Sequence, residues 1–414
     1  MTNWREWRAK LGGLWRRFVR HVSRATPEQS PPLPRSLDEL PPAKPAVAVA
    51  EADAVTAPGP STAKIPLPPK APESASATPG VERRAPRPAP PAPAAPRGRW
   101  YSETMMVAAG RIDLAPWVPP ARTYRIYEPA ALAPDPCLLV VLHGCRQTAE
   151  DIAEGTRLNE HAEERGWLVV YPEQAIAANK YGCWNWFDPA NQRGDGECAI
   201  IVAMQDAVRL RYGLEHAHTF LAGMSAGGAL VSLLALRYPE RWAAVAIHSG
   251  LPYGAATDPW GAQRAMREGA LNLAAAQTLR LDSSAAAVPA LILHGNADNV
   301  VDRRNAELLM RQFLGWNGYF PNAADWDNAA LPPVDDAHLK TPYGHSYILR
   351  DYGQPDRAPV RECEVVGMGH AWSGGDSALP YHDELGPDAS ALMVEFFAGI
   401  ANPEPLKEMP ISRP

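Results

Sequence analysis

Two kinds of apolar pattern recur along residues 100–400: uninterrupted apolar runs and apolar residues at helical spacing. Uninterrupted apolar runs of strand length occupy 138–142, 167–171, 219–222, 243–248 and 290–294. Helical patterns occupy 149–165, 199–212, 226–236, 302–314 and 388–400. The alternation at 122–127 predicts an early edge strand, and 346–366 predicts a hairpin. Strands that alternate with helices predict an α/β fold, in which helices cover both faces of a mostly parallel sheet.

The first quarter of the chain has a different composition. Of the 44 prolines in the 414 residues, 20 lie between Pro27 and Pro96, among Ala, Ser, Thr and scattered charges. Such a stretch cannot bury a core, so 27–98 is predicted to be a disordered, proline-rich linker. The remainder has the usual size of one large α/β domain, which we place at 99–403, followed by a tail at 404–414.

Residues 1–26 predict a basic amphipathic helix. Its apolar face would consist of Trp4, Trp7, Leu11, Leu14, Trp15, Phe18 and Val22, with Arg5, Arg8, Arg16, Arg17, Arg20 and Arg24 on the other face. The segment has no uninterrupted apolar stretch and no small-residue cleavage site, so we expect neither a secretory signal nor a membrane span. Such a helix can lie on an anionic membrane or a lipid-coated particle. Docking on its own domain or on a protein partner stays open.

The charge is unevenly distributed between this helix and the rest. Residues 1–26 hold seven Lys or Arg and one Glu, and the whole chain has a net charge of −6. The part beyond the helix is therefore acidic, which argues against a nucleic-acid substrate. Five cysteines, at 137, 145, 183, 198 and 363, show no metal-ligand spacing, so no metal is expected.

The stretch Gly223-Met-Ser225-Ala-Gly227 joins a predicted strand directly to a predicted helix. Small residues on both sides of Ser225 let strand and helix approach and leave the hydroxyl above the sheet, as in a nucleophile elbow. A glycine-rich turn without chemistry is the alternative. The strand and helix on either side favour the nucleophile.

A serine nucleophile needs a base, and the base needs an orienting acid. Asp298 follows the strand at 290–294, and His370 lies in a glycine-rich loop after the predicted hairpin. The order Ser, acid, His is that of α/β-hydrolases. Asp302 is the alternative acid, but it lies where a helix begins and is more simply a cap.

Two backbone N–H groups are candidates for stabilising the charge on a substrate carbonyl. One belongs to Ala226, directly after the nucleophile, and the other to Cys145 in the loop "HGCRQ". Because this role uses the backbone, the Cys145 side chain can also be a buried free thiol. A disulfide between Cys145 and Cys183, each beside a motif at the presumed sheet edge, is a further hypothesis.

Five blocks carry a resemblance to a known family. They are "LHGCRQTAEDIAEGTRLNEHAEERGWLVVYPEQ", "GCWNWFDPANQRGDGECAII", "AGMSAGGALVSLLALRYPERWAAVAIHSGLPYGAA", "LHGNADNVV" and "GMGHAWSGG". In this order they resemble the esterase family of poly(3-hydroxybutyrate) depolymerases, which also includes feruloyl and acetylxylan esterases. The resemblance implies an α/β-hydrolase fold and a serine nucleophile, in agreement with Ser225, Asp298 and His370.

The resemblance also implies an activity. We expect a carboxylic-ester hydrolase that acts through an acyl-enzyme without a cofactor, on hydroxyalkanoate polymers or oligomers. Feruloyl or acetylxylan esters are the alternative substrates, and an inactive binding or scaffolding protein is the alternative of another class. Residues 1–26 would then meet an anionic membrane or a polyester granule, and both an extracellular and a cytoplasmic location stay open.

Two further features concern the substrate. Trp184, Trp186 and Trp372 flank the motifs and could form an apolar wall for an acyl or aryl group, although core packing is as common for Trp. Residues 316–345 look like a variable insertion near the site, which bears on the choice of substrate.

Family members often begin with a cleavable signal peptide, whereas here the basic helix and linker come first, which bears on secretion.

Overall fold

The structure is a computed structural model that describes residues 98–106, 121–281, 285–320, 322, 324–328, 332–342, 344–354 and 357–402. The predicted helix at 1–26, almost all of the predicted linker and the predicted tail at 404–414 lie outside these residues. The three candidates Ser225, Asp298 and His370 all lie within them.

One sheet of ten strands forms the centre, in the order β1-β2-β4-β3-β5-β6-β7-β10-β9-β8. The strands are β1 (Arg99–Met106), β2 (Ala121–Glu128), β3 (Leu138–Leu142), β4 (Leu168–Pro172), β5 (Thr219–Met224), β6 (Ala244–His248), β7 (Ala290–Gly295), β8 (Asp335–Lys340), β9 (Ser346–Gln354) and β10 (Arg357–Val365). The six neighbouring strands β4, β3, β5, β6, β7 and β10 are parallel to one another. Antiparallel strands flank this group on both sides. The short strands β11 (Trp372–Ser373) and β12 (His382–Asp383) pair separately.

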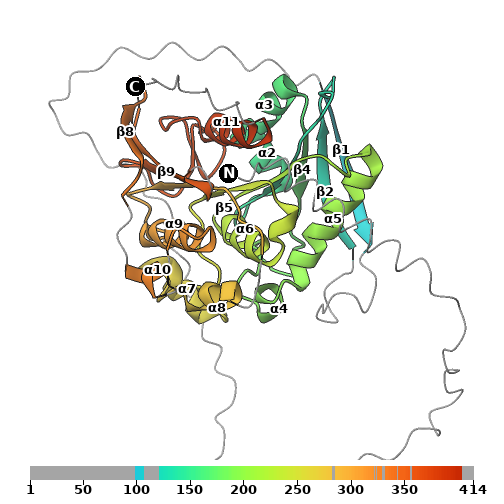
Figure 1. The fold of residues 1–414 in the computed structure, drawn as a ribbon. Coiled ribbons are helices and arrows are strands. Elements are labelled where there is room, and N and C mark those ends of the chain that lie inside the picture. Colours follow the sequence, from blue (N-terminus) through green and yellow to red (C-terminus); the bar gives the residue numbers. More distant parts are fainter. Residues whose placement is uncertain are drawn as a thin grey trace, which may run out of the picture. The chain divides into compact units, whose positions relative to one another are not determined.

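Helices cover both faces of this sheet (Figure 1). The helices α5 (Gly196–Tyr212), α6 (Ala226–Arg237) and α9 (Arg304–Trp316) contribute to one apolar core, and α2 (Ala149–Thr156), α3 (Leu158–Arg165) and α11 (Ala389–Ala401) contribute to a second. The other helices among the described residues are α4 (Pro189–Gln192), η2 (Pro239–Arg241), α7 (Pro259–Glu268), α8 (Ala274–Leu281) and α10 (Asp325–Asn328). The predicted α/β architecture is therefore confirmed. None of the described helices has the length and apolar character to span a membrane.

Two predicted elements differ from the structure. The helix predicted over 149–165 is broken at Arg157, whose φ of 56° is left-handed. The carbonyls just before the break bond outside the helix: Gly155 accepts from the amide of Asp376, and Thr156 accepts from the hydroxyl of Ser390. The strand at 121–128 is not the edge, because β1, which the alternation did not reveal, pairs with it.

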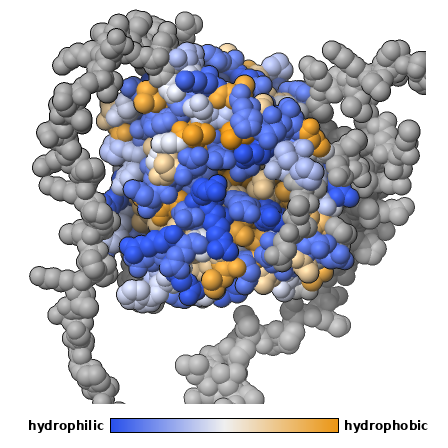
Figure 2. Space-filling view, turned by 90° about the vertical axis from the view of Figure 1, so that its left-hand side faces the viewer, coloured by the Kyte–Doolittle hydropathy of each residue, from blue (hydrophilic) through white to orange (hydrophobic). Residues whose placement is uncertain are grey.

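The segment 316–345 adds an edge to the sheet. Its β8 pairs with β9, while α10 packs on α9. Its last residue, His345, lies near the loop of His370: its Nε2 is 3.2 Å from Asp383 Oδ2, and a Cβ on Gly367 would come within 3.6 Å of its Nδ1. The face that includes β8 and β9 shows mostly hydrophilic residues with small separate hydrophobic groups (Figure 2). Ion pairs of Arg350 with Glu362 and Glu364 fit this polar character.

Candidate active site

Ser225 occupies a sharp turn between β5 and α6. Its φ of 55° and ψ of −120° are unusual for a residue with a side chain, and its amide donates to the carbonyl of His248 at 2.9 Å. Close approach requires glycine beside it: a Cβ on Gly227 would lie 2.3 Å from the carbonyl oxygen of Leu142. The small residues of the motif thus serve the tight strand-to-helix turn expected from the sequence.

Strand register brings the other candidates to the same edge. Leu142 of β3 pairs with Gly223 of β5, so the loop after β3 starts beside the elbow. Gly295 of β7 pairs with Val365 of β10, so the loops that carry Asp298 and His370 also start side by side. Parallel strands end at one edge of the sheet, which is where ligands bind in this class of fold.

Ser225, His370 and Asp298 form one hydrogen-bonded chain. The distance from His370 Nε2 to Ser225 Oγ is 3.0 Å, and the distance from His370 Nδ1 to Asp298 Oδ2 is 2.7 Å. An ionised carboxylate only accepts hydrogen bonds, so Nδ1 carries the proton and Nε2 is free to accept from the serine. This is the arrangement in which a histidine can act as a general base.

Asp298 is held in an environment suited to its negative charge. Its side chain is fully buried, and Oδ1 accepts hydrogen bonds from the amides of Val300 and Val301 at 2.8 and 2.9 Å. Burial by itself would raise the pKa of Asp298, but the hydrogen bonds from His370 and from the amide of Val301, together with the charges of His370 and His294, lower it overall. The alternative acid, Asp302, instead accepts from the amide of Arg304 at the start of α9, as a cap does.

Three buried histidines in the strands and loops around Ser225, His370 and Asp298 were not predicted as site residues. Burial lowers the pKa of His143 to about 4 and that of His248 to about 3, and it also lowers the pKa of His294. His248 Nε2 accepts from the amide of Ser373, three residues after His370, at 3.1 Å. The sequence does carry a signal for these three residues: each apolar run of β3, β6 and β7 ends in a histidine or is followed by one. Near pH 7 these rings are neutral supports of the loops.

The loop after β3 lies directly over the nucleophile. A Cβ on Gly144 would come within 3.4 Å of the Cβ of Ser225. The next residue, Cys145, forms a disulfide with Cys183, as hypothesised. The amide of Ala226, the first residue of α6, has no acceptor within the helix, as in any first turn. Both backbone groups proposed to stabilise an oxyanion therefore belong to residues next to Ser225 or to its covering loop.

A buried carboxylate organises the loop that carries Cys183. Glu197 Oε1 accepts from Gln174 Nε2 at 2.5 Å and from Asn185 Nδ2 at 2.8 Å, while Oε2 accepts from the Asn185 amide at 2.7 Å and from Asn191 Nδ2 at 3.2 Å. Burial raises the pKa of Glu197, although these hydrogen bonds oppose the effect. In the sequence, Glu197 is distinguished only by its place in the block "GCWNWFDPANQRGDGECAII". The structure shows it as the centre of the loop's polar contacts.

The three tryptophans do not form an exposed wall. The exposed fractions are 1% for Trp184, 3% for Trp186 and 0% for Trp372. Trp184 donates its indole N–H to the carbonyl of His143, and Trp372 stacks on His248 at 5.2 Å. Their burial corrects the expectation of an apolar wall and favours the packing alternative.

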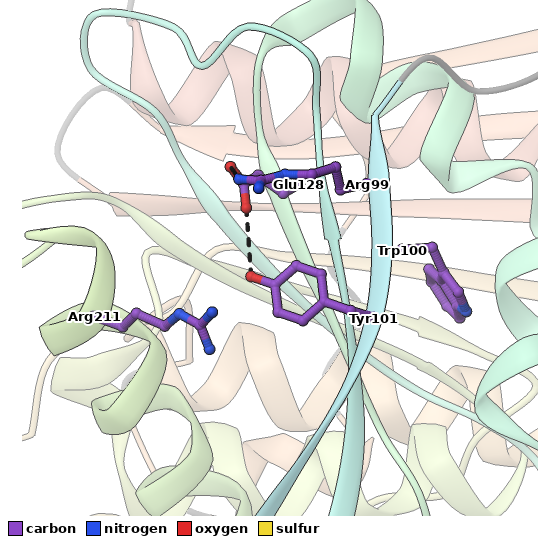
Figure 3. Close-up of a pocket in the computed structure, with 5 residues that line it drawn as sticks. All are labelled: Arg99, Trp100, Tyr101, Glu128 and Arg211. Carbon is purple, nitrogen blue, oxygen red and sulfur yellow. Dashed lines mark hydrogen bonds and ion pairs between the residues drawn. The ribbon is translucent and has the colours of Figure 1, made fainter.

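A surface pocket of about 430 Å³ lies elsewhere, along β1 (Figure 3). It is lined by Arg99, Trp100, Tyr101, Glu128 and Arg211. In strand order it is four strands from β5, so it is separate from Ser225. Both of its arginines are neutralised, since Arg99 pairs with Glu128 and Arg211 pairs with a glutamate of β1. Across the described residues, no cluster of three His, Cys, Asp or Glu side chains could hold a metal ion.

Comparison with known proteins gives consistent results. Residues 122–329 match the family model described as esterase PHB depolymerase. The chain is 31% identical over 235 residues to poly(3-hydroxyalkanoate) depolymerase C of Paucimonas lemoignei, covering 55% of this chain and 56% of that protein. It is 34% identical over 129 residues to feruloyl esterase B of Neurospora crassa, covering 31% of this chain and 43% of that protein. The chain thus spans about half the length of these two relatives.

Two further comparisons extend the match. Acetylxylan esterase A of Aspergillus oryzae is 26% identical over 222 residues, covering 51% of this chain and 71% of that protein. The solved structure of acetyl xylan esterase from Aspergillus awamori superposes with a TM-score of 0.51 at 20% identity, covering 65% of this chain and 94% of that chain. This likeness shows the shared fold.

Proposed function

Because the chain belongs to the esterase PHB depolymerase family, we propose that it is a serine carboxylic-ester hydrolase that acts through an acyl-enzyme. The observation that carries the proposal is the hydrogen-bonded chain Ser225–His370–Asp298, with distances of 3.0 and 2.7 Å. A protein that only bound or scaffolded partners would not need these hydrogen bonds between a serine, a histidine and an aspartate. The geometry therefore favours an active enzyme over an inactive relative.

The first half of the reaction forms the acyl-enzyme. His370 Nε2 takes the proton of Ser225 Oγ as the oxygen attacks the ester carbonyl, and Asp298 stabilises the resulting imidazolium. The carbonyl oxygen becomes negative and accepts hydrogen bonds from the backbone N–H groups of Ala226 and Cys145. The imidazolium then passes its proton to the leaving alcohol as the C–O bond breaks.

The second half releases the acid. Water loses a proton to His370 Nε2 while its oxygen attacks the acyl carbon, and the same two N–H groups stabilise the charge. Collapse of this intermediate returns the proton to Ser225 Oγ and frees the carboxylic acid. No step requires a group beyond these residues.

For the substrate, we propose esters of hydroxyalkanoates, polymeric or oligomeric, with 3-hydroxybutyrate as the reference unit. The match over 235 residues to a protein named as a poly(3-hydroxyalkanoate) depolymerase supports this choice. The matches to proteins named as feruloyl and acetylxylan esterases support aryl or acetyl esters of plant polysaccharides as the second candidate. Both candidates use the same serine chemistry.

A fluorophosphonate probe and an ester panel test this proposal. The probe should label the chain on Ser225, identified by peptide mass spectrometry, because only an activated serine reacts readily. Hydroxybutyrate oligomers should be hydrolysed with a higher kcat/KM than methyl ferulate or acetylated xylan. Labelling without turnover of any ester would contradict the proposed activity, and preference for ferulate would select the second candidate.

We further propose that residues 1–26 attach the enzyme to an anionic surface, a membrane or a polyester granule. The segment's aromatic positions would bury apolar area there, and its arginines would each add roughly 1 kcal/mol close to an anionic surface. The proline-rich stretch that follows would let the active site reach nearby esters while the segment stays bound.

Charge reversal in the full-length chain tests the attachment. Replacing Arg16, Arg17 and Arg20 by Glu should abolish co-flotation with vesicles containing anionic lipid at low salt, because attraction becomes repulsion. Turnover of soluble esters should not change, since the proposed chemistry lies beyond residue 140. Unaltered flotation of the charge-reversed protein would point to another role for the segment, most simply docking to a protein.

A further inference from the structure

Two cations and a tyrosine form an exposed cluster beside the loop that covers the nucleophile. Lys180 Nζ lies 4.9 Å from the centre of the Tyr181 ring, and the guanidinium carbon of Arg146 lies 5.7 Å from it. All three side chains are exposed. We refer to Arg146, Lys180 and Tyr181 as the basic cluster.

The two cations lack an acidic partner. Neither Arg146 nor Lys180 has a carboxylate within ion-pair distance in the part of the chain that the structure describes. By contrast, Arg125, Arg350 and Arg361 are each paired with an acid. In a chain of net charge −6, two adjacent cations without an acid can attract an anion from outside.

The backbone fixes the basic cluster close to Ser225. The amide of Arg146 donates to the carbonyl of Tyr181 at 2.9 Å, and the preceding residue is tied by the Cys145–Cys183 disulfide. Arg146 also holds a left-handed φ of 64°, which only a constrained loop maintains. Arg146 is two residues after Gly144, and a Cβ added to Gly144 would come within 3.4 Å of the Cβ of Ser225. Because successive Cα atoms lie about 3.8 Å apart, the Arg146 backbone is only two such steps from Gly144. An arginine side chain here can reach a substrate bound at the serine.

We propose that the basic cluster binds a carboxylate carried by the ester substrate itself, a few bonds from the scissile carbonyl. The enzyme would thereby select esters with a free acid end, such as short hydroxyalkanoate oligomers, over neutral esters of the same length. The guanidinium and ammonium groups pair with the carboxylate, and the Tyr181 ring holds both cations in place. This inference rests on the proposed ester hydrolysis and narrows its substrate class.

A matched pair of substrates tests the inference. The linear dimer of 3-hydroxybutyrate is compared with its methyl ester, in which a neutral methyl ester replaces the carboxylate. Because this replacement adds a second ester bond, kcat/KM is measured for cleavage of the internal ester in both substrates. We expect the acid-to-methyl-ester ratio to fall about threefold to fivefold in Arg146→Gln or Lys180→Gln and about tenfold in the double variant. The loss should lie mainly in KM, since the carboxylate is bound before and during the reaction.

Two controls separate charge from structure. Arg146→Lys should retain most of the ratio, because it keeps the charge. Arg165→Gln should leave the ratio unchanged: Arg165 is also exposed and lies over the ring of Trp167, but it ends α3 just before β4 starts, at the opposite edge of the sheet. The ratio is measured within one sample, so it does not depend on the amount of folded enzyme.

Salt provides a second measurement. Raising the ionic strength from about 0.05 M to about 0.5 M should lower the wild-type ratio and should have little effect on that of the double variant. If the double variant keeps the wild-type ratio, the inference is wrong while the ester hydrolysis stands. If neither the dimer nor its methyl ester is hydrolysed by the wild type, the inference is wrong together with the proposed hydroxyalkanoate substrate, and the proposed function itself fails if no other ester is hydrolysed either.

Discussion

Replacing Ser225 by alanine is expected to lower kcat for ester hydrolysis by at least about 10⁴-fold, because the nucleophile of the acyl-enzyme is removed. His370→Ala should cause a loss of similar size, since Ser225 Oγ then has no base at 3.0 Å. The double variant should be no slower than either single variant, because the residues act as a unit. Initial rates on an activated aryl ester, corrected for background hydrolysis, measure all three.

The acid can be assigned by the same measurement. Asp298→Asn should lower kcat by about 10⁴-fold while the fold is kept, because an amide can no longer fix the Nδ1–H tautomer of His370. The matched control is Asp302→Asn, four residues away, whose carboxylate caps α9 rather than contacting the histidine. It should cost little rate and about 1 kcal/mol of stability at most.

Two results would contradict this assignment. Near-wild-type turnover by Ser225→Ala protein would exclude the acyl-enzyme route. A strong loss in Asp302→Asn together with an active Asp298→Asn would move the acid to residue 302. Thermal unfolding of each variant shows whether a lost rate is a lost fold.

The sequence could predict the hydrogen-bonded chain because its signals are local. Ser225 was marked by the glycines that the tight turn needs, and Asp298 and His370 each stood in a loop after a predicted strand. Parallel strands end at one edge, so these loops had to meet there. Which aspartate faces the histidine was also decidable, because Asp302 stood where a cap was needed.

The features that the sequence could not predict depend on contacts between distant segments. The break at Arg157 is stabilised by groups from residues 376 and 390, which no local pattern reveals. The hydrogen bonds of Glu197 with Gln174 likewise join a helix and a loop. Whether a tryptophan beside a motif faces the substrate or the core is also a tertiary matter. Trp372, wholly buried against His248, illustrates this point.

Loss of the Cys145–Cys183 disulfide is the second change with a large expected effect. The bridge joins residues 38 apart in sequence, and closing a loop of that length in the unfolded chain corresponds to about 4 kcal/mol of stability in the chain-entropy model. The double variant Cys145→Ala, Cys183→Ala should lose free energy of unfolding of that order, measured in urea. Its kcat should fall as well, because Cys145 supplies a backbone donor and the bridge restrains its loop.

Reductant gives a matched control for this prediction. The three other cysteines, Cys137, Cys198 and Cys363, are free and buried, so a mild reductant should act on the wild type through the bridge alone. It should make the wild type resemble the double variant and leave the variant itself unchanged. Mass spectrometry of non-reduced peptides shows whether the disulfide is present before reductant is added. Finding Cys145 and Cys183 as free thiols in oxidised protein would contradict the bridge.

The size of the two losses separates the roles of the bridge. If stability falls by about 4 kcal/mol while kcat on neutral esters is kept, the bridge acts on the unfolded chain and Glu197 suffices to hold the loop. If kcat falls beyond tenfold at temperatures where the variant is fully folded, the bridge also keeps the Cys145 amide aimed at the oxyanion. We expect the second result, because Gly144, next to Cys145, lies against Ser225 and a small displacement there moves a donor out of hydrogen-bond range.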